Sequence, residues 1–185
     1  MTMLNPKKGR LLVAEPSILS DDSFNRAIVL LTEHTENNSV GFILNKPLSY
    51  SINDLLPEIN CFFNIYQGGP VEQDNLYFIH RIPQLLADSI EVANGVFWGG
   101  NFKQLKQLLN EGLLQETDIR FFLGYAGWDK NQLNTELQEN SWFVAKNDFE
   151  NIFSKDEETL WKNKLLQKGG AYKLWANAPN NINLN

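Results

Sequence analysis

The sequence has little cysteine and little histidine: one cysteine, Cys61, and two histidines, His34 and His80, in 185 residues. A single cysteine excludes an internal disulfide and is typical of proteins from a reducing compartment. So few ligands also exclude a cysteine-rich structural zinc site. A catalytic zinc held by both histidines and Glu33 or Asp74 is formally possible, but no H-E-x-x-H spacing supports it. We therefore predict no metal and no cofactor.

Long apolar runs are missing as well. No apolar run reaches the roughly 18 residues that a membrane-spanning helix needs. The apolar segment 11–14, which follows a few basic residues near the N-terminus, is too short for the core of a signal peptide. We expect a cytoplasmic protein with no membrane partner.

Positive charge is the third scarce feature. Lys and Arg number 16 against 22 Asp and Glu, which gives a formal net charge of −6. Nucleic-acid binding depends on cations that neutralise phosphates, and this balance argues against it. The densest group of lysines, within 162–173, is interrupted by Trp and Leu and is typical of the wet edge of an amphipathic helix.

Motifs for covalent chemistry and phosphate binding are absent too. The sequence contains no G-x-S-x-G, no G-x-x-x-x-G-K-[ST] and no G-x-G-x-x-G. Cys61 precedes Phe62 and Phe63, which favours a small buried side chain over a reactive thiol. We predict that Cys61 is unreactive.

The residues that are plentiful predict an ordinary globular domain. Hydrophobic residues make up 43% of the chain and include 12 Phe and 5 Trp, enough to fill a core without disulfides. We expect one domain over residues 1–175 and a loose, Asn-rich C-terminal tail over 176–185.

Hydrophobic patterning and turn residues predict the order of elements. Strands are expected at 11–14, 27–32, 40–44, 61–66, 76–80, 88–92, 96–98, 120–125 and 141–146. Capping signals and helical spacing predict helices after Ser51, at 102–111, at about 131–138 and from Ser154 to about 168. Three hairpin-like pairs are expected: 27–32 with 40–44, 61–66 with 76–80, and 88–92 with 96–98. The fold class is α+β: a mixed, largely antiparallel sheet flanked by helices in a single compact domain.

Several segments, in this order, carry a family resemblance. They are GRLLVAEP at 9–16, Asp22 with Phe24, LLTEH at 30–34, GFILNKP at 41–47, GGPV at 68–71, His80, GYAGW at 124–128, Gln132-Leu133, Glu136 and Trp142. Together they resemble the AlgH/YqgE family over residues 9 to about 170. The resemblance implies an α+β fold with a mixed sheet flanked by helices. Members are often labelled transcriptional regulators, although no helix-turn-helix with a basic recognition helix is visible in this sequence.

Two departures from the family pattern lie together. The family resembles E-H-N-x-x-G here, whereas this chain has Thr35 in place of Asn and Asn38 in place of Gly. Asn38 is a mild change because Asn tolerates positive φ. Thr35 removes an amide that both donates and accepts hydrogen bonds.

The segment Asn45-Lys46-Pro47 is the first candidate for a functional site. It ends an apolar strand with an amide, a cation and a rigid residue, and strand ends that border a cleft often hold small molecules. Alternatively, Asn45 caps loose backbone groups, Lys46 is solvated and Pro47 stops the strand. The hairpin places His34 either abreast of Asn45 or on the opposite side, and both arrangements stay open.

Two glycine-containing segments are further candidates. Gly124-Tyr125-Ala126-Gly127-Trp128 is predicted to lie between a strand and a helix, where its N–H groups can face an anion. The alternative is a tight turn at Gly127 with Trp128 packed as a plug. Gln67-Gly68-Gly69-Pro70 is either a loop that approaches another backbone closely or a hairpin bend.

Three functional hypotheses follow. The first is a non-enzymatic binding or regulatory module that senses a small molecule or a protein through a cleft lined by Asn45, Lys46, Gly68, Gly69 and Trp128. The second is an enzyme for a small anionic metabolite, in which Lys46 holds the anion and His34 or His80 is the acid or base. The third, DNA regulation, is disfavoured by the net charge.

Overall fold

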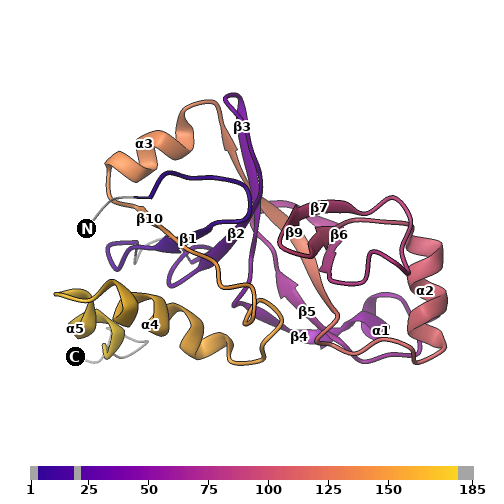
Figure 1. The fold of residues 1–185 in the computed structure, drawn as a ribbon. Coiled ribbons are helices and arrows are strands. Elements are labelled where there is room, and N and C mark those ends of the chain that lie inside the picture. Colours follow the sequence, from indigo (N-terminus) through magenta and orange to yellow (C-terminus); the bar gives the residue numbers. More distant parts are fainter. Residues whose placement is uncertain (1–3, 19–21, 179–185) are drawn as a thin grey trace.

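In the described part of the chain, ten strands form one sheet (Figure 1). The computed structural model describes residues 4–18 and 22–178. The strands are β1 Leu11–Ala14, β2 Ile28–His34, β3 Asn38–Ile43, β4 Pro47–Ser51, β5 Asn64–Gln67, β6 Val71–His80, β7 Ile90–Ala93, β8 Val96–Trp98, β9 Ile119–Asp129 and β10 Trp142–Ala145. The helices are α1 Ile52–Leu55, α2 Phe102–Asn110, α3 Gln132–Gln138, α4 Glu157–Lys168 and α5 Tyr172–Ala176. Within these described residues, no helix has the length and hydrophobicity needed to cross a membrane.

The main path of the sheet is antiparallel and runs β10-β1-β2-β3-β9-β6-β8-β7. Strand β5 lies off this path and pairs with β4 in antiparallel and with β9 in parallel orientation. This arrangement confirms the predicted α+β class with a mixed, largely antiparallel sheet. The hairpins β2–β3 and β7–β8 are also confirmed.

The long strand β9 lies between segments that were predicted to pair with each other. Phe121 and Phe122 pair with β5 and also with β6, so β5 and β6 must lie on opposite edges of β9. The predicted hairpin-like pair of 61–66 with 76–80 is therefore wrong. Residues 68–70 instead carry the chain from one edge of β9 to the other.

Strand β1 and the first four residues of β2, 28–31, are apolar because both of their faces are covered. Leu11 and Val13 of β1 belong to a core cluster with α4, whereas Leu12 and Ala14 belong to a cluster with α3. Figure 1 shows α3 on one side of these strands and α4 with α5 on the other. A strand buried on both faces has no polar alternation, which explains the continuous apolar sequence.

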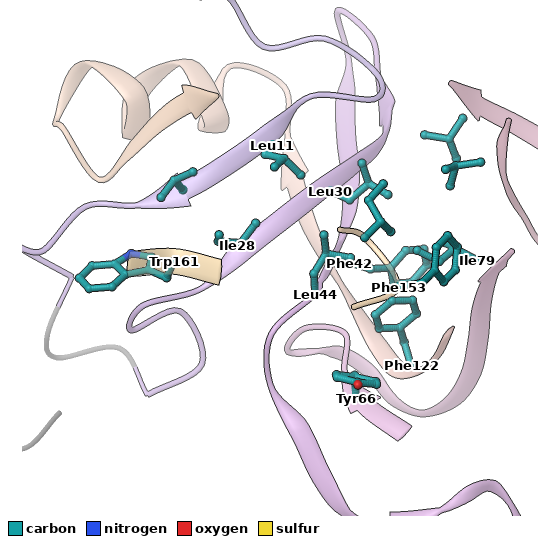
Figure 2. Packing of buried hydrophobic residues seen from close by; sticks show 14 of the residues in the cluster. Leu11, Ile28, Leu30, Phe42, Leu44, Tyr66, Ile79, Phe122, Phe153 and Trp161 are labelled. Carbon is teal, nitrogen blue, oxygen red and sulfur yellow. The ribbon is translucent and has the colours of Figure 1, made fainter. Parts of the chain in front are cut away.

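Aromatic stacking fills the cluster on the α4 side (Figure 2). The rings of Phe42 and Phe122 stack with centroids 4.8 Å apart and an interplanar angle of 16°. Trp161 brings α4 into the same cluster, together with Ile28 of β2. A third cluster lies between the sheet and helices α1 and α2.

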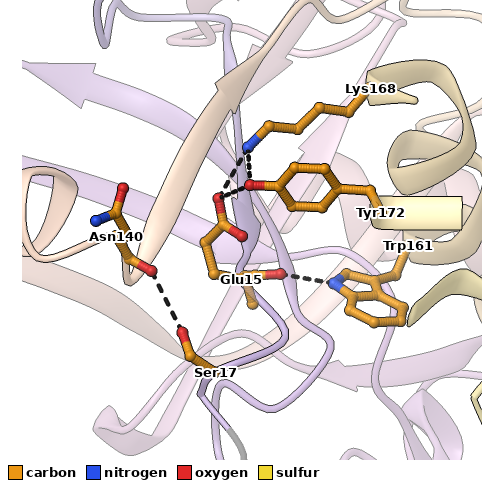
Figure 3. A network of polar contacts seen from close by, with 7 residues as sticks. Glu15, Ser17, Asn140, Trp161, Lys168 and Tyr172 are labelled. Carbon is orange, nitrogen blue, oxygen red and sulfur yellow. Dashed lines mark hydrogen bonds and ion pairs between the residues drawn. The ribbon is translucent and has the colours of Figure 1, made fainter. Parts of the chain in front are cut away.

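Polar contacts at the end of β1 anchor α4 and α5 (Figure 3). Trp161 Nε1 donates a hydrogen bond to Ala14 O at 2.8 Å. Glu15 Oε1 accepts hydrogen bonds from Lys168 Nζ at 2.8 Å and from Tyr172 Oη at 2.9 Å. These bonds fix the C-terminal helices to the start of the chain.

Local capping signals predicted the helix starts with mixed success. Ser51 with Asp54 forms the predicted capping box, and the Asn101 side chain accepts from Gln104 N as the predicted N-cap of α2. The capping box predicted at Ser154 is wrong, because α4 begins at Glu157 and Ser154 Oγ instead accepts from the N–H of its N-cap, Asp156, at 3.1 Å.

Only part of the tail predicted at 176–185 is described. Ala176 is the last residue of α5, and its side chain is buried. Residues 179–185 lie outside the described residues.

Candidate functional site

The side chain of Asn45 is occupied by backbone groups. Its Oδ1 accepts a hydrogen bond from Ile28 N at 2.8 Å, and its Nδ2 donates to Arg26 O at 2.9 Å. Lys46 Nζ donates to Asp22 O at 2.5 Å. Both side chains therefore hold the segment that leads into β2, which favours the capping alternative for Asn45.

Gly68 and Gly69 lie where one backbone crosses another. A Cβ atom at Gly68 would come within 2.1 Å of Gly124 O, and one at Gly69 within 2.2 Å of the Tyr125 backbone. Gly68 also joins the strands around it, because its N–H donates to Leu123 O and its carbonyl accepts from Ile43 N, both at 2.8 Å. Of the two predicted roles, close approach to a backbone describes this segment.

Gly127 and Trp128 lie within β9, which continues to Asp129. The turn predicted between a strand and a helix at this position is wrong, because β9 pairs with β3 through Gly127↔Val40 and Trp128↔Ser39. The indole of Trp128 is buried, as expected for a packed plug.

The carboxylate of Glu136, in α3, accepts hydrogen bonds from two indole N–H groups. Glu136 Oε2 accepts from Trp128 Nε1 at 2.8 Å and from Trp142 Nε1 at 2.9 Å. The two indole rings meet edge to face with centroids 6.0 Å apart, and Phe24 contacts both of them. These bonds hold α3 against the sheet, so Trp128 is one of the sheet residues that pack beneath α3.

His34, Ser39 and Trp128 form a row across three strands. His34 pairs with Ser39 between β2 and β3, and Ser39 pairs with Trp128 between β3 and β9. His34 Nδ1 and Ser39 Oγ are hydrogen bonded at 2.8 Å. No described residue is hydrogen bonded to the other ring nitrogen of His34, Nε2, and the ring is half-buried.

A polar cavity of about 390 Å³, here called the hairpin cavity, opens beside this row. It lies between the turn of the β2–β3 hairpin and the segment that joins β9 to α3. Its lining residues are His34, Thr35, Glu36, Asn38, Ser39, Asp129, Lys130, Asn131, Leu133 and Asn134. Two carboxylates, one ammonium, an imidazole and several amides thus surround one hollow.

The sequence predicted only one residue of the hairpin cavity, His34. Asp129, Lys130, Asn131 and Asn134 were missed because strand pairing brings them across from a distant part of the chain. The polar sequence DKN at 129–131 is the one local signal, and it is equally typical of an ordinary surface turn.

The predicted site residues therefore fall at two places. His34 lines the hairpin cavity, with Gly127 and Trp128 in the adjoining strand β9. Asn45, Lys46, Gly68 and Gly69 lie beyond the other end of β3, where Gln67 N donates to Lys46 O at 2.8 Å. His34 and Asn45 are at opposite ends of the hairpin. The structure thus brings Asn45, Lys46, Gly68 and Gly69 together and places Trp128 in the strand beside His34 and Ser39.

The second histidine, His80, is enclosed by backbone. Its side chain is fully buried; Nε2 donates to Gly99 O at 3.0 Å, and Nδ1 accepts from Ile82 N at 3.2 Å. Burial lowers the pKa of His80, so the neutral ring is favoured. Both nitrogens are occupied, so His80 cannot act as the acid or base of the proposed enzyme.

Burial raises the pKa of the Cys61 thiol, which favours its protonated form. The prediction that Cys61 is unreactive is consistent with this environment. Among the described residues, no group of three His, Cys, Asp or Glu side chains is arranged to hold a metal ion.

Solved structures share this α+β architecture. A crystal structure of a Corynebacterium diphtheriae protein matches with a TM-score of 0.77 at 22% identity, covering 96% of this chain and 95% of the other. The solution structure of AlgH from Pseudomonas aeruginosa matches with a TM-score of 0.73 at 23% identity, covering 98% of this chain and 100% of the other. At these identities the likeness concerns the fold alone.

Sequence comparison then identifies the family. The AlgH-like family model matches residues 11–173, and the chain belongs to this family. A UPF0301 protein of Cytophaga hutchinsonii is 43% identical over 180 residues, which are 96% of this chain and 98% of the relative. A UPF0301 protein of Chlorobaculum parvum is 38% identical over 174 residues, 94% of this chain and 92% of the relative. The resemblance inferred from the ordered motifs is confirmed.

Proposed function

We propose that this chain is a non-enzymatic, cytoplasmic binding module that takes a small polar molecule in the hairpin cavity. The observation that carries the proposal is the hydrogen bonding of the two ring nitrogens of His34. Ser39 Oγ holds Nδ1 at 2.8 Å and fixes the ring, while Nε2 has no partner among the described residues. A fixed imidazole with one open nitrogen is a ready hydrogen-bonding group for a ligand.

The charges around the cavity favour a polar rather than an apolar ligand. Glu36 and Asp129 supply carboxylates, Lys130 supplies an ammonium, and Asn131 and Asn134 supply amides. Both signs of charge and neutral donors and acceptors are within one volume of about 390 Å³, which is within the usual range for small-molecule sites. The net charge of −6 argues against nucleic acid as the partner.

An enzyme remains the second candidate, and one observation speaks for it: the pair His34–Ser39 joins a possible base to a hydroxyl at 2.8 Å. Two observations weaken it. Ser39 is only 4% exposed, which leaves its oxygen little access to a substrate. The enzyme hypothesis assigns anion binding to Lys46, but Lys46 lies at the other end of β3 and donates to Asp22 O.

The test is a nuclear magnetic resonance titration of the labelled chain with a defined panel of amino acids, sugars and nucleosides. We expect at least one compound to shift the amide signals of residues 34–39 and 129–134, and His34→Gln to abolish that shift. Lys103→Ala, on the exposed surface of α2, is the matched control and should bind as the unaltered chain does. Equal binding by His34→Gln would contradict the proposal, and turnover that His34→Gln removes would favour the enzyme instead.

A further inference from the structure

A second cavity, of about 310 Å³ and here called the α4 cavity, lies on the other face of the sheet. It is formed between helix α4 and residues 147–156. Two of its lining residues, Leu11 and Leu44, belong to the core cluster on the α4 side, whereas Leu133 of the hairpin cavity belongs to the cluster on the α3 side. The two cavities are therefore separate sites.

Helix α4 presents one continuous stripe to this cavity. Thr159, Leu160, Asn163, Lys164 and Gln167 line it and follow the three- and four-residue spacing of one helix face. The neighbouring stripe, with Trp161 and Leu165, packs into the core. Thr159, Asn163 and Gln167 are exposed to solvent, so Lys164 is the one buried polar member of this stripe.

Lys164 is the unusual member of the stripe. Its side chain is only 8% exposed, and its Nζ forms an ion pair with Asp148 Oδ2 at 3.8 Å, a separation too long for a hydrogen bond. Nζ donates one long hydrogen bond, to Lys146 O at 3.3 Å, and no other described residue accepts from it. A buried ammonium has three donors and loses much free energy when they are poorly paired, so it favours an oxygen acceptor in the cavity.

The charges of the lining select against ions of either sign. The lining contains one ammonium, from Lys164, and two carboxylates, from Asp148 and Asp156. An anionic ligand would meet two carboxylates, and a cationic one would meet the buried ammonium at close range. The uncharged lining consists of amides, the hydroxyls of Ser154 and Thr159, and apolar side chains. The amides include those of Asn151, Asn163 and Gln167, and the apolar side chains include Leu11, Leu44, Ile152 and Leu160.

The walls of the α4 cavity are held in place by a buried arginine. Arg120 is 4% exposed; its Nη1 donates to Leu44 O at 2.7 Å, and its Nη2 donates to Ser154 O at 2.5 Å. Its guanidinium also stacks over the ring of Tyr66, 4.2 Å from the centroid. Because Leu44 and Ser154 both line the cavity, the Arg120 side chain joins two segments of its lining.

We infer that the α4 cavity binds a small uncharged molecule that presents a lactam or amide carbonyl to Lys164 Nζ and an apolar part to the leucines. A lactam has an acceptor beside a donor, which matches the paired donor and acceptor of the Asn and Gln side chains. The carbonyl supplies the oxygen that Lys164 lacks without bringing a charge toward Asp148 and Asp156.

The experiment titrates three probes of similar size into the full chain and monitors the amide signals by nuclear magnetic resonance. Thymine is a neutral ring with lactam groups, orotate carries the same kind of ring with a carboxylate, and toluene has no carbonyl. We expect thymine to shift signals of residues 147–167 and to leave 34–39 and 129–134 unchanged. Orotate and toluene should each bind at least about tenfold more weakly, since one meets like charge and the other lacks the acceptor.

Variants assign the binding to Lys164. Lys164→Met keeps the length of the side chain and removes the ammonium, and should weaken thymine binding about tenfold or more. Asp148→Asn, which removes one carboxylate, should strengthen orotate binding and leave thymine binding unchanged. If Lys164→Met does not fold, Asn163→Ala on the exposed surface of α4 should still weaken thymine binding.

The inference is overturned if thymine causes no shift at 147–167, if orotate binds as tightly as thymine, or if Lys164→Met binds thymine unchanged. Because the hairpin cavity and the α4 cavity are followed by different amide signals, either proposal can fail without the other.

Discussion

The two ends of strand β3 carry different polar groups: Asn45 and Lys46 follow its last residue, and His34 of β2 pairs with Ser39 near its first. The two groups differ in how many of their hydrogen-bonding atoms already have partners. At the GFILNKP end, both polar atoms of the Asn45 amide are bonded to backbone, and Lys46 donates to a backbone carbonyl. At the hairpin end, one nitrogen of His34 is bonded to Ser39, and no described residue occupies the other.

The difference shows why a polar residue at a strand end is weak evidence for a site. Backbone groups that leave a sheet need partners, and an Asn in that position commonly supplies them. Asn45 does so for the start of β2, a role that is structural. Of the two ends of β3, the hairpin end is the one where the described residues leave a polar atom, His34 Nε2, open to a ligand.

Gly68→Ala should have the largest effect on the free energy of unfolding. It disrupts the packing at the end of β3 that the GFILNKP segment forms. The new Cβ atom would come within 2.1 Å of Gly124 O, a backbone atom that cannot move without separating β5 from β9. We expect a loss of about 3 kcal/mol or more in the free energy of unfolding, measured by urea denaturation.

Gly127→Ala is the matched control for this change. Its Cβ atom would meet the Tyr125 ring at 3.2 Å, a side-chain contact at a position in β9 where φ is not positive. The cost should stay below about 1 kcal/mol. Equal losses in the two variants would show that the crossing of backbones at Gly68 is not what requires glycine.

Asn45→Ala should have the next largest effect. It removes the partners of Ile28 N and Arg26 O in a partly buried position, at a cost of about 2 kcal/mol. Asn134→Ala, at the hairpin cavity, removes an exposed amide of α3 and should change the free energy of unfolding by less than about 0.5 kcal/mol. The same denaturation experiment measures both, and a cost for Asn134→Ala that matched Asn45→Ala would remove the distinction between the ends of β3.

The sequence predicted the parts of this fold that depend on neighbours along the chain. The turn at Asn94 and Gly95 joins β7 to β8 as expected, with positive φ at both residues, and Asn101 caps α2. It did not predict the crossing at residues 68–70, because a glycine that permits a turn and one that permits close approach look the same in sequence. Only long-range pairing with β9 distinguishes them.

The candidate site was predicted to a smaller extent for the same reason. His34 was found because an imidazole is chemically distinctive at any position. Its partner Ser39 and the polar residues at 129–134 are ordinary turn and strand residues until the pairing of β3 with β9 places them together. Burial of His80 was equally invisible, since a histidine enclosed by backbone and one that lines a cavity have the same local sequence signal.

His34→Gln should have a small effect on stability, and it is the sharpest test of the comparison. Gln keeps a polar side chain at a half-buried position, and the bond lost is the single one to Ser39. The free energy of unfolding should therefore fall by no more than about 1 kcal/mol, less than for Asn45→Ala. A loss above that of Asn45→Ala would mean that His34 holds the hairpin together, as Asn45 holds the start of β2. A small loss, with ligand shifts at 34–39 and 129–134 abolished, would separate binding from stability at the end of β3 where no described residue is hydrogen bonded to His34 Nε2.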